Sequence, residues 1–190
     1  MRMTASERIR ARIKGQPVDR LPVIEWAPWW NLTVENWIKQ GLPSETAKSV
    51  YDLQNHFNLD KCIQTYFHVR SHETPVAPSH GAGIIKTEED YERIRPTMYK
   101  KPYLPKEYVE WLKKTHNDGD TIHFFTVEGF FWMPRELFGI EEHLYSFFDQ
   151  PELLERICSD YLEWLKSVIE YVGNTFTFDF MSFAEDMSYN

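Results

Sequence analysis

The chain has 190 residues, of which 21 are basic and 29 acidic, and its formal net charge is -8. This excess of acidic residues argues against a basic surface that contacts phosphate groups, and therefore against a nucleic-acid partner. The first residues lack the apolar stretch of a secretory signal, and no window approaches the ~18 apolar residues of a membrane span. With two widely spaced cysteines, Cys62 and Cys158, these features predict a soluble, cytoplasmic protein.

The first third of the chain alternates between helical and extended patterns. A helix is predicted over 7–14 and a strand near 21–25, where the run Leu-Pro-Val-Ile is apolar. Helices are predicted over 33–40 and 44–57, before a strand over 61–67. The order is typical of a βαβ unit.

Residues 68–105 are the least regular stretch, a long excursion or a small subdomain with a short strand over 83–86. The remaining segments again alternate: a helix over 105–116, a strand over 121–127, helices over 134–138, 140–148 and 151–172, and a strand over 176–183. The alternation predicts an α/β fold, with four parallel strands adjacent in one curved sheet and helices outside it.

In parallel α/β folds, ligands bind at the carboxyl edge of the sheet, so polar residues just beyond each strand are the candidate site. They are Glu25, His68, Glu128 and the pair Glu185 and Asp186. The alternative interpretation is that strand ends are simply where polar residues begin. If the site hypothesis is right, Glu25, Glu128 and Asp186 project to the same edge.

Aromatic side chains accompany two of these acids. Glu25 is followed by Trp26, Trp29 and Trp30, which would desolvate the carboxylate and form a wall for a flat or bulky ligand. The alternative is that the indoles plug the end of the fold or cover a helix.

Glu128 precedes Gly129 and Trp132. This glycine either lets the backbone approach a ligand closely or serves as a simple turn residue. We predict Trp132 as a substrate-binding residue.

His68, His72 and His80 invite a metal interpretation, because imidazole is a common zinc ligand. Their spacing matches no compact site, so we predict no metal site in this chain and assign His68 to substrate binding. The sequence also has no phosphate-binding glycine loop, no Gly-x-Ser-x-Gly elbow and no Cys-x-x-Cys. Nucleotide binding and serine hydrolysis are therefore poorly supported.

Four stretches resemble the uroporphyrinogen decarboxylase superfamily, which includes cobalamin-dependent methyltransferases. They are residues 7–23, residues 25–30, residues 138–139 with 149–154, and the closing Phe-Ala-Glu-Asp of 183–186. The resemblance implies a (β/α)8 TIM barrel, of which 1–190 would be the amino-terminal part, roughly the first four βα units of one domain. In it, the acid after the fourth strand corresponds to Asp186.

The resemblance also bears on activity and cofactors. The decarboxylases carry paired arginines and an aspartate in the segment that corresponds to 25–30, which here contains no arginine. In the methyltransferases, His and Cys residues of the later half hold zinc, so any metal ligands would lie beyond Asn190. The resemblance implies no cofactor within this chain, and zinc and a corrinoid protein for the full-length parent.

The lead hypothesis is therefore part of a barrel enzyme from the methyltransferase or uncharacterised branch. Glu185, Asp186, Glu25 and Glu128 would be the catalytic acids of a small-molecule site. One alternative is decarboxylation of a tetrapyrrole in porphyrin biosynthesis, and another is a non-catalytic module that binds a ligand or partner. We expect the chain alone to be a poor catalyst that self-associates or binds a missing carboxy-terminal half.

Overall fold

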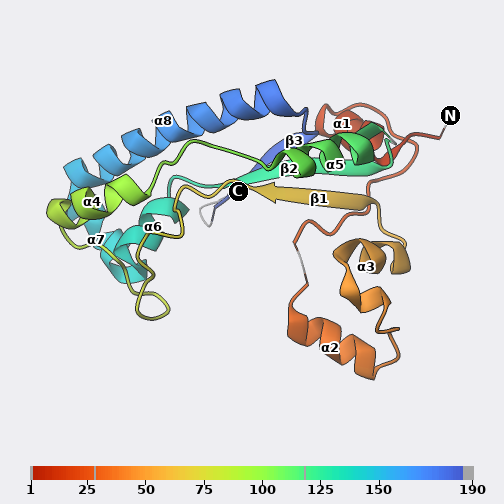
Figure 1. The fold of residues 1–190 in the computed structure, drawn as a ribbon, viewed down its shortest axis with the longest axis horizontal. Helices are drawn as coiled ribbons and strands as arrows, with labels where there is room; N and C mark the ends of the chain where they lie inside the picture. Colours follow the sequence, from red (N-terminus) through yellow and green to blue (C-terminus); the bar gives the residue numbers. More distant parts are fainter. Residues whose placement is uncertain (1, 28, 118, 186–190) are drawn as a thin grey trace. The chain divides into compact units, whose positions relative to one another are not determined.

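A computed structural model describes residues 2–27, 29–117 and 119–185. Its elements alternate between helices and strands (Figure 1), which confirms the mixed α/β class predicted from the sequence. In chain order they are α1 (Ala5–Ile13), α2 (Asn31–Lys39), η1 (Thr46–Lys48), α3 (Val50–His56), β1 (Lys61–Tyr66), α4 (Glu88–Ile94), η2 (Arg95–Thr97), α5 (Lys106–Asn117), β2 (Thr121–Glu128), α6 (Trp132–Phe138), α7 (Ile140–Asp149), α8 (Pro151–Thr175) and β3 (Phe180–Ala184).

The three strands form one parallel sheet in the order β1-β2-β3. The register of β2 and β3 follows from two backbone bonds: the Asp179 amide donates to the His123 carbonyl at 2.7 Å, and the Gly129 amide donates to the Ala184 carbonyl at 2.8 Å. From the first bond to the second, the residue numbers rise along both strands, so the two strands are parallel. Every residue of β2 is buried, as expected for the central strand of a sheet.

The predicted strand at 21–25 is wrong, because the described residues there form no strand. Pro22 has no amide hydrogen to donate to a ladder. The amide of Val23 donates at 2.9 Å to the side chain of Asp60, and the Val23 carbonyl accepts from the Asp60 amide at 2.8 Å. The Val23 amide therefore bonds to a side chain and not to a neighbouring strand.

Two further expectations are corrected. The last strand spans 180–184, so it begins four residues later and ends one residue later than the predicted 176–183. The segment 83–86 forms no strand, because the amides of Ile84 and Ile85 both donate to the Leu137 carbonyl, at 2.7 and 3.1 Å, at the end of α6. Helix α4 was not predicted, although Thr87 and Asp90 form a capping box at its start.

The described chain forms two compact units, and each strand begins in unit 1 and ends in unit 2. Unit 1 comprises residues 1–65, 105–125 and 176–181. Its core contains Ala5 of α1, Cys62 of β1 and the pair Ile122 and Phe124 of β2. Helix α1 begins at a capping box between Thr4 and Glu7, two residues earlier than the predicted helix over 7–14.

An ion-pair cluster joins α1 to the loop before α2 and to the start of β1. Arg8, only 2% exposed, donates to Asp19 at 2.8 Å and to Asp60 at 3.2 Å. Arg20 also donates to Asp60, at 2.7 Å. The hydrogen bond from Arg8 holds the pKa of the Asp19 carboxyl well below its usual range. These ion pairs hold the segment around Asp19 and Arg20 against α1, and loss of a partner would leave the buried charge of Arg8 less well compensated.

Unit 2 comprises residues 66–104, 126–175 and 182–190. Its longest element, α8, packs against α6 and α7. Most of the apolar side chains of α8 are buried, but Ile169 is 49% exposed. None of the described helices combines the length and the apolar character needed to cross a bilayer.

Candidate active site

The carboxyl ends of the three parallel strands carry ionisable side chains that all belong to unit 2. His68 and Arg70 follow β1, Glu128 is the last residue of β2, and Glu185 follows β3. Strand ends gather at one edge of a parallel sheet, and this is the edge at which such folds bind ligands. The structure thus brings Glu128 and Glu185 to that edge, as the sequence predicted.

Glu128 is the most buried of these acids, at 8% exposure. Its Oε1 lies 3.4 Å from Nη2 of Arg70, a long contact, and its Oε2 is buried without a hydrogen-bond partner among the described residues. Burial raises the pKa of the Glu128 carboxyl, although the charges of Arg70 and His68 oppose the rise. A raised pKa makes a carboxyl group a better proton acceptor than a solvated carboxylate.

Arg70 connects Glu128 to a cavity. Its Nη2 also lies 3.2 Å from Oε2 of Glu136, on α6. Glu136 lines a cavity of about 450 Å³ together with Trp132, Arg135 and His80, among other residues. The guanidinium of Arg135 lies 4.6 Å above the centre of the Trp132 ring, which fixes both side chains in the wall. Trp132 therefore lines a cavity large enough for a small ligand, and its role in substrate binding stays a prediction.

Glu185 has a different environment. Its Oε2 accepts from the Phe131 amide at 2.9 Å and its Oε1 from the Trp132 amide at 3.1 Å, so the carboxylate closes the start of α6. Gly129 makes room for it, because a Cβ at that position would lie 2.0 Å from Oε2 of Glu185. The close approach expected at this glycine is thus made by a carboxylate of the same chain.

The other predicted residues are placed as follows. Glu25 is half-buried in unit 1, and its Oε1 accepts from the Ala27 amide at 3.5 Å. Trp29 packs against Trp37 and Phe57, with ring centres 5.6 and 5.9 Å away, in line with the alternative that these indoles cover a helix.

Trp26 and Trp30 are 56% and 78% exposed. His68 is exposed and stacks on Tyr66 at 5.3 Å. Asp186 lies outside the described residues. Because Glu25 belongs to unit 1 and Glu128 to unit 2, their shared edge stays a prediction.

Two residues of the site were not predicted. Arg70 is only two residues beyond His68, so a wider search past the end of β1 would have found it. Glu136 lies in the middle of α6, and only the fold shows that it faces Arg70.

Within the described residues, no three His, Cys, Asp or Glu side chains are arranged to hold a metal ion. The resemblance implies that the zinc ligands of the parent protein lie beyond Asn190, so this finding does not bear on them.

Comparisons of the chain with models of known protein families, with curated proteins and with solved structures find no match. The fold and the residues at the edge of the sheet are thus the basis for any functional conclusion.

Proposed function

We propose that this chain is part of an enzyme that transforms a small molecule at the carboxyl edge of its sheet, with Glu128 as the proton-transfer residue. The observation that carries the proposal is the buried Oε2 of Glu128, which has no partner among the described residues and ends the central strand. An unpaired buried oxygen costs roughly 1–3 kcal/mol, a cost that a ligand donor would remove.

Arg70 would position this carboxyl group and moderate its proton affinity. It contacts Glu128 and Glu136 at 3.4 and 3.2 Å, so it keeps a negative charge on each side. Trp132 would provide the apolar surface for the substrate in the adjacent cavity. Glu185, whose carboxylate accepts two amides, would hold the start of α6 in place beside the site.

The parallel order β1-β2-β3 supports the finer proposal of a (β/α)8 barrel of the uroporphyrinogen decarboxylase superfamily. Within it we propose the methyltransferase or uncharacterised branch, because residues 25–30 contain no arginine to grip the carboxylates of a tetrapyrrole. In that branch, a corrinoid protein would be the partner and a second part of the barrel would cover the sheet.

The test compares the chain with Glu128→Gln, which keeps the size of the side chain but cannot exchange a proton. The control is Glu142→Gln, an exposed acid on α7. Two reactions are followed under single-turnover conditions, because we expect slow turnover: methyl transfer from methylcobalamin to a small thiol, and release of CO2 from uroporphyrinogen.

The expected result is slow methyl transfer that Glu128→Gln reduces about 100-fold or more and Glu142→Gln leaves unchanged. Turnover in the CO2 assay alone would assign the chain to the decarboxylases. Binding of a tetrapyrrole or thiol without turnover would identify a binding module. Equal activity of Glu128→Gln and the unaltered chain would refute the role of Glu128.

A further inference from the structure

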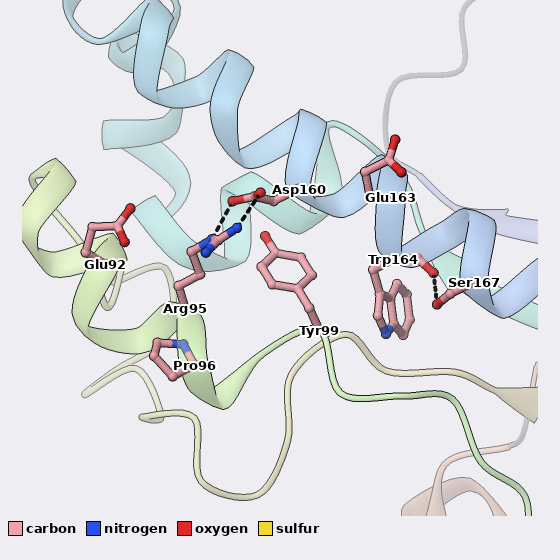
Figure 2. A pocket seen from close by; sticks show the side chains of 8 residues that line it. All are labelled: Glu92, Arg95, Pro96, Tyr99, Asp160, Glu163, Trp164 and Ser167. Atoms are coloured by element: carbon pink, nitrogen blue, oxygen red, sulfur yellow. Dashed lines mark hydrogen bonds and ion pairs between the residues drawn. The ribbon is translucent and has the colours of Figure 1, made fainter.

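Unit 2 contains a second cavity, remote in sequence from the strand ends. It has a volume of about 600 Å³ and lies between the η2 region and α8 (Figure 2). Its walls are Glu92, Arg95, Pro96 and Tyr99 on one side and Asp160, Glu163, Trp164 and Ser167 on the other. The proposed function uses none of these residues.

The floor of this cavity is built from a closed hydrogen-bond network. Arg95 donates to both oxygens of Asp160, at 2.7 and 2.8 Å, and Tyr91 donates to the same carboxylate at 2.8 Å. The hydroxyls of Tyr91 and Tyr99 lie 2.7 Å apart. The two charges of the Arg95–Asp160 pair therefore neutralise each other and hold the η2 region at a fixed distance from α8.

Aromatic rings form the apolar part of the wall. Trp164 is anchored because its Nε1 donates to the Lys100 carbonyl at 2.8 Å and its ring stacks on Tyr161. Tyr99 has a φ of 57°, in the left-handed region that a bulky side chain rarely adopts. Its amide donates to the Val69 carbonyl at 2.9 Å, which holds this backbone in place. Both rings are thus positioned without filling the cavity.

The remaining charges of the cavity are acidic. With Arg95 and Asp160 paired, Glu92 and Glu163 are the other carboxylates of the wall, and Figure 2 shows them on opposite sides of that pair. Their partners, Arg156 and Lys166, are exposed, and exposed ion pairs are worth only about 0–1 kcal/mol. A ligand cation can therefore replace either partner at little cost.

We propose that this cavity binds an aliphatic diamine or polyamine, with one ammonium group at Glu92, another at Glu163 and the methylene chain against Tyr99 and Trp164. Two separated carboxylates match a cation with charges at both ends. The rings of Tyr99 and Trp164 in the same wall suit an alkyl chain that carries positive charge, through apolar contact and cation–π attraction.

The test is isothermal titration of the full chain with spermidine at 0.15 M salt, where weak charge attraction is screened. We expect saturable binding at one site. The double variant Glu92→Gln with Glu163→Gln should weaken it at least tenfold. Because both glutamates are exposed, the variant should fold normally, as circular dichroism will verify.

The matched control is Glu155→Gln with Glu170→Gln, which removes two exposed charges from α8 outside the cavity. It should change the dissociation constant less than twofold. Octane-1,8-diol, a neutral molecule of similar length, should not bind. Absence of saturable binding, equal weakening by both double variants, or equal binding of the diol would each overturn the proposal.

Discussion

His123 provides a measurable link between burial and pH-dependent stability. It lies in β2 and is fully buried. The centre of its ring lies 5.7 Å from that of His116 and 5.3 Å from that of Phe176. Its Nε2 is 3.3 Å from the Thr115 hydroxyl, while Nδ1 is buried without a hydrogen-bond partner in the described structure. Burial and the charge of His116 lower the pKa of His123 to about 4.

The sign and size of the effect follow from this value. In the unfolded chain the imidazole titrates near 6.5, so between pH 6.5 and 4 the unfolded state binds a proton that the folded state rejects. The contribution of His123 to stability is therefore full above pH 6.5 and is lost as the pH falls through 4. The difference between the two values corresponds to roughly 3 kcal/mol.

Urea unfolding, followed by circular dichroism from pH 7 to pH 4, measures this contribution. The variant His123→Phe keeps a ring in the aromatic cluster and removes the titrating group. Between pH 7 and pH 4 both proteins should lose free energy of unfolding. The loss should be roughly 3 kcal/mol smaller for His123→Phe than for the unaltered chain. The control His72→Gln changes an exposed histidine and should leave the pH dependence unchanged. Equal pH dependence of His123→Phe and the unaltered chain would refute the argument.

Three other changes test the packing. Gly129→Ala places a methyl group against Glu185 and should cost about 1–3 kcal/mol in urea unfolding, whereas Gly173→Ala, where no atom lies within 4 Å, should be neutral or stabilising. Asp60→Asn should cost roughly 3 kcal/mol in the same assay, because it leaves buried Arg8 with a weaker partner; little change would show that the cluster is dispensable. Phe183 is 45% exposed on the edge strand β3, and Phe183→Lys would place a charge there. Light scattering should show less self-association for this variant. Unaltered scattering would exclude the β3 edge as the contact between copies.

The secondary structure could be predicted where one local pattern dominates. Helix α8 has a long apolar stripe and β2 is rich in β-branched and aromatic residues, and both were predicted. One wrong prediction arises where a side chain competes with the backbone for a hydrogen bond. Residues 21–25 have the apolar pattern of a strand, but the Val23 amide donates to the Asp60 carboxylate. The other missed element is helix α4. It buries two residues, Tyr91 and Ile94, and two apolar positions are too few for the sequence pattern to indicate a helix.

The strand-end rule located the edge of the site but did not assign roles within it. Glu128 and Glu185 both stand at the end of a parallel strand, yet their environments differ. The Glu185 carboxylate accepts from the amides of Phe131 and Trp132 at the start of α6, so both of its oxygens are hydrogen-bonded.

Glu128 instead has a long contact with Arg70, and within the described residues its Oε2 is buried without a hydrogen-bond partner. Burial raises the pKa of the Glu128 carboxyl, which makes it a better proton acceptor, and we therefore propose Glu128 rather than Glu185 for proton transfer. The difference comes from Gly129, which lets Glu185 reach the α6 amides. Consequently, Gly129→Ala should disturb the start of α6, and with it Trp132 in the cavity wall, without changing an ionisable group.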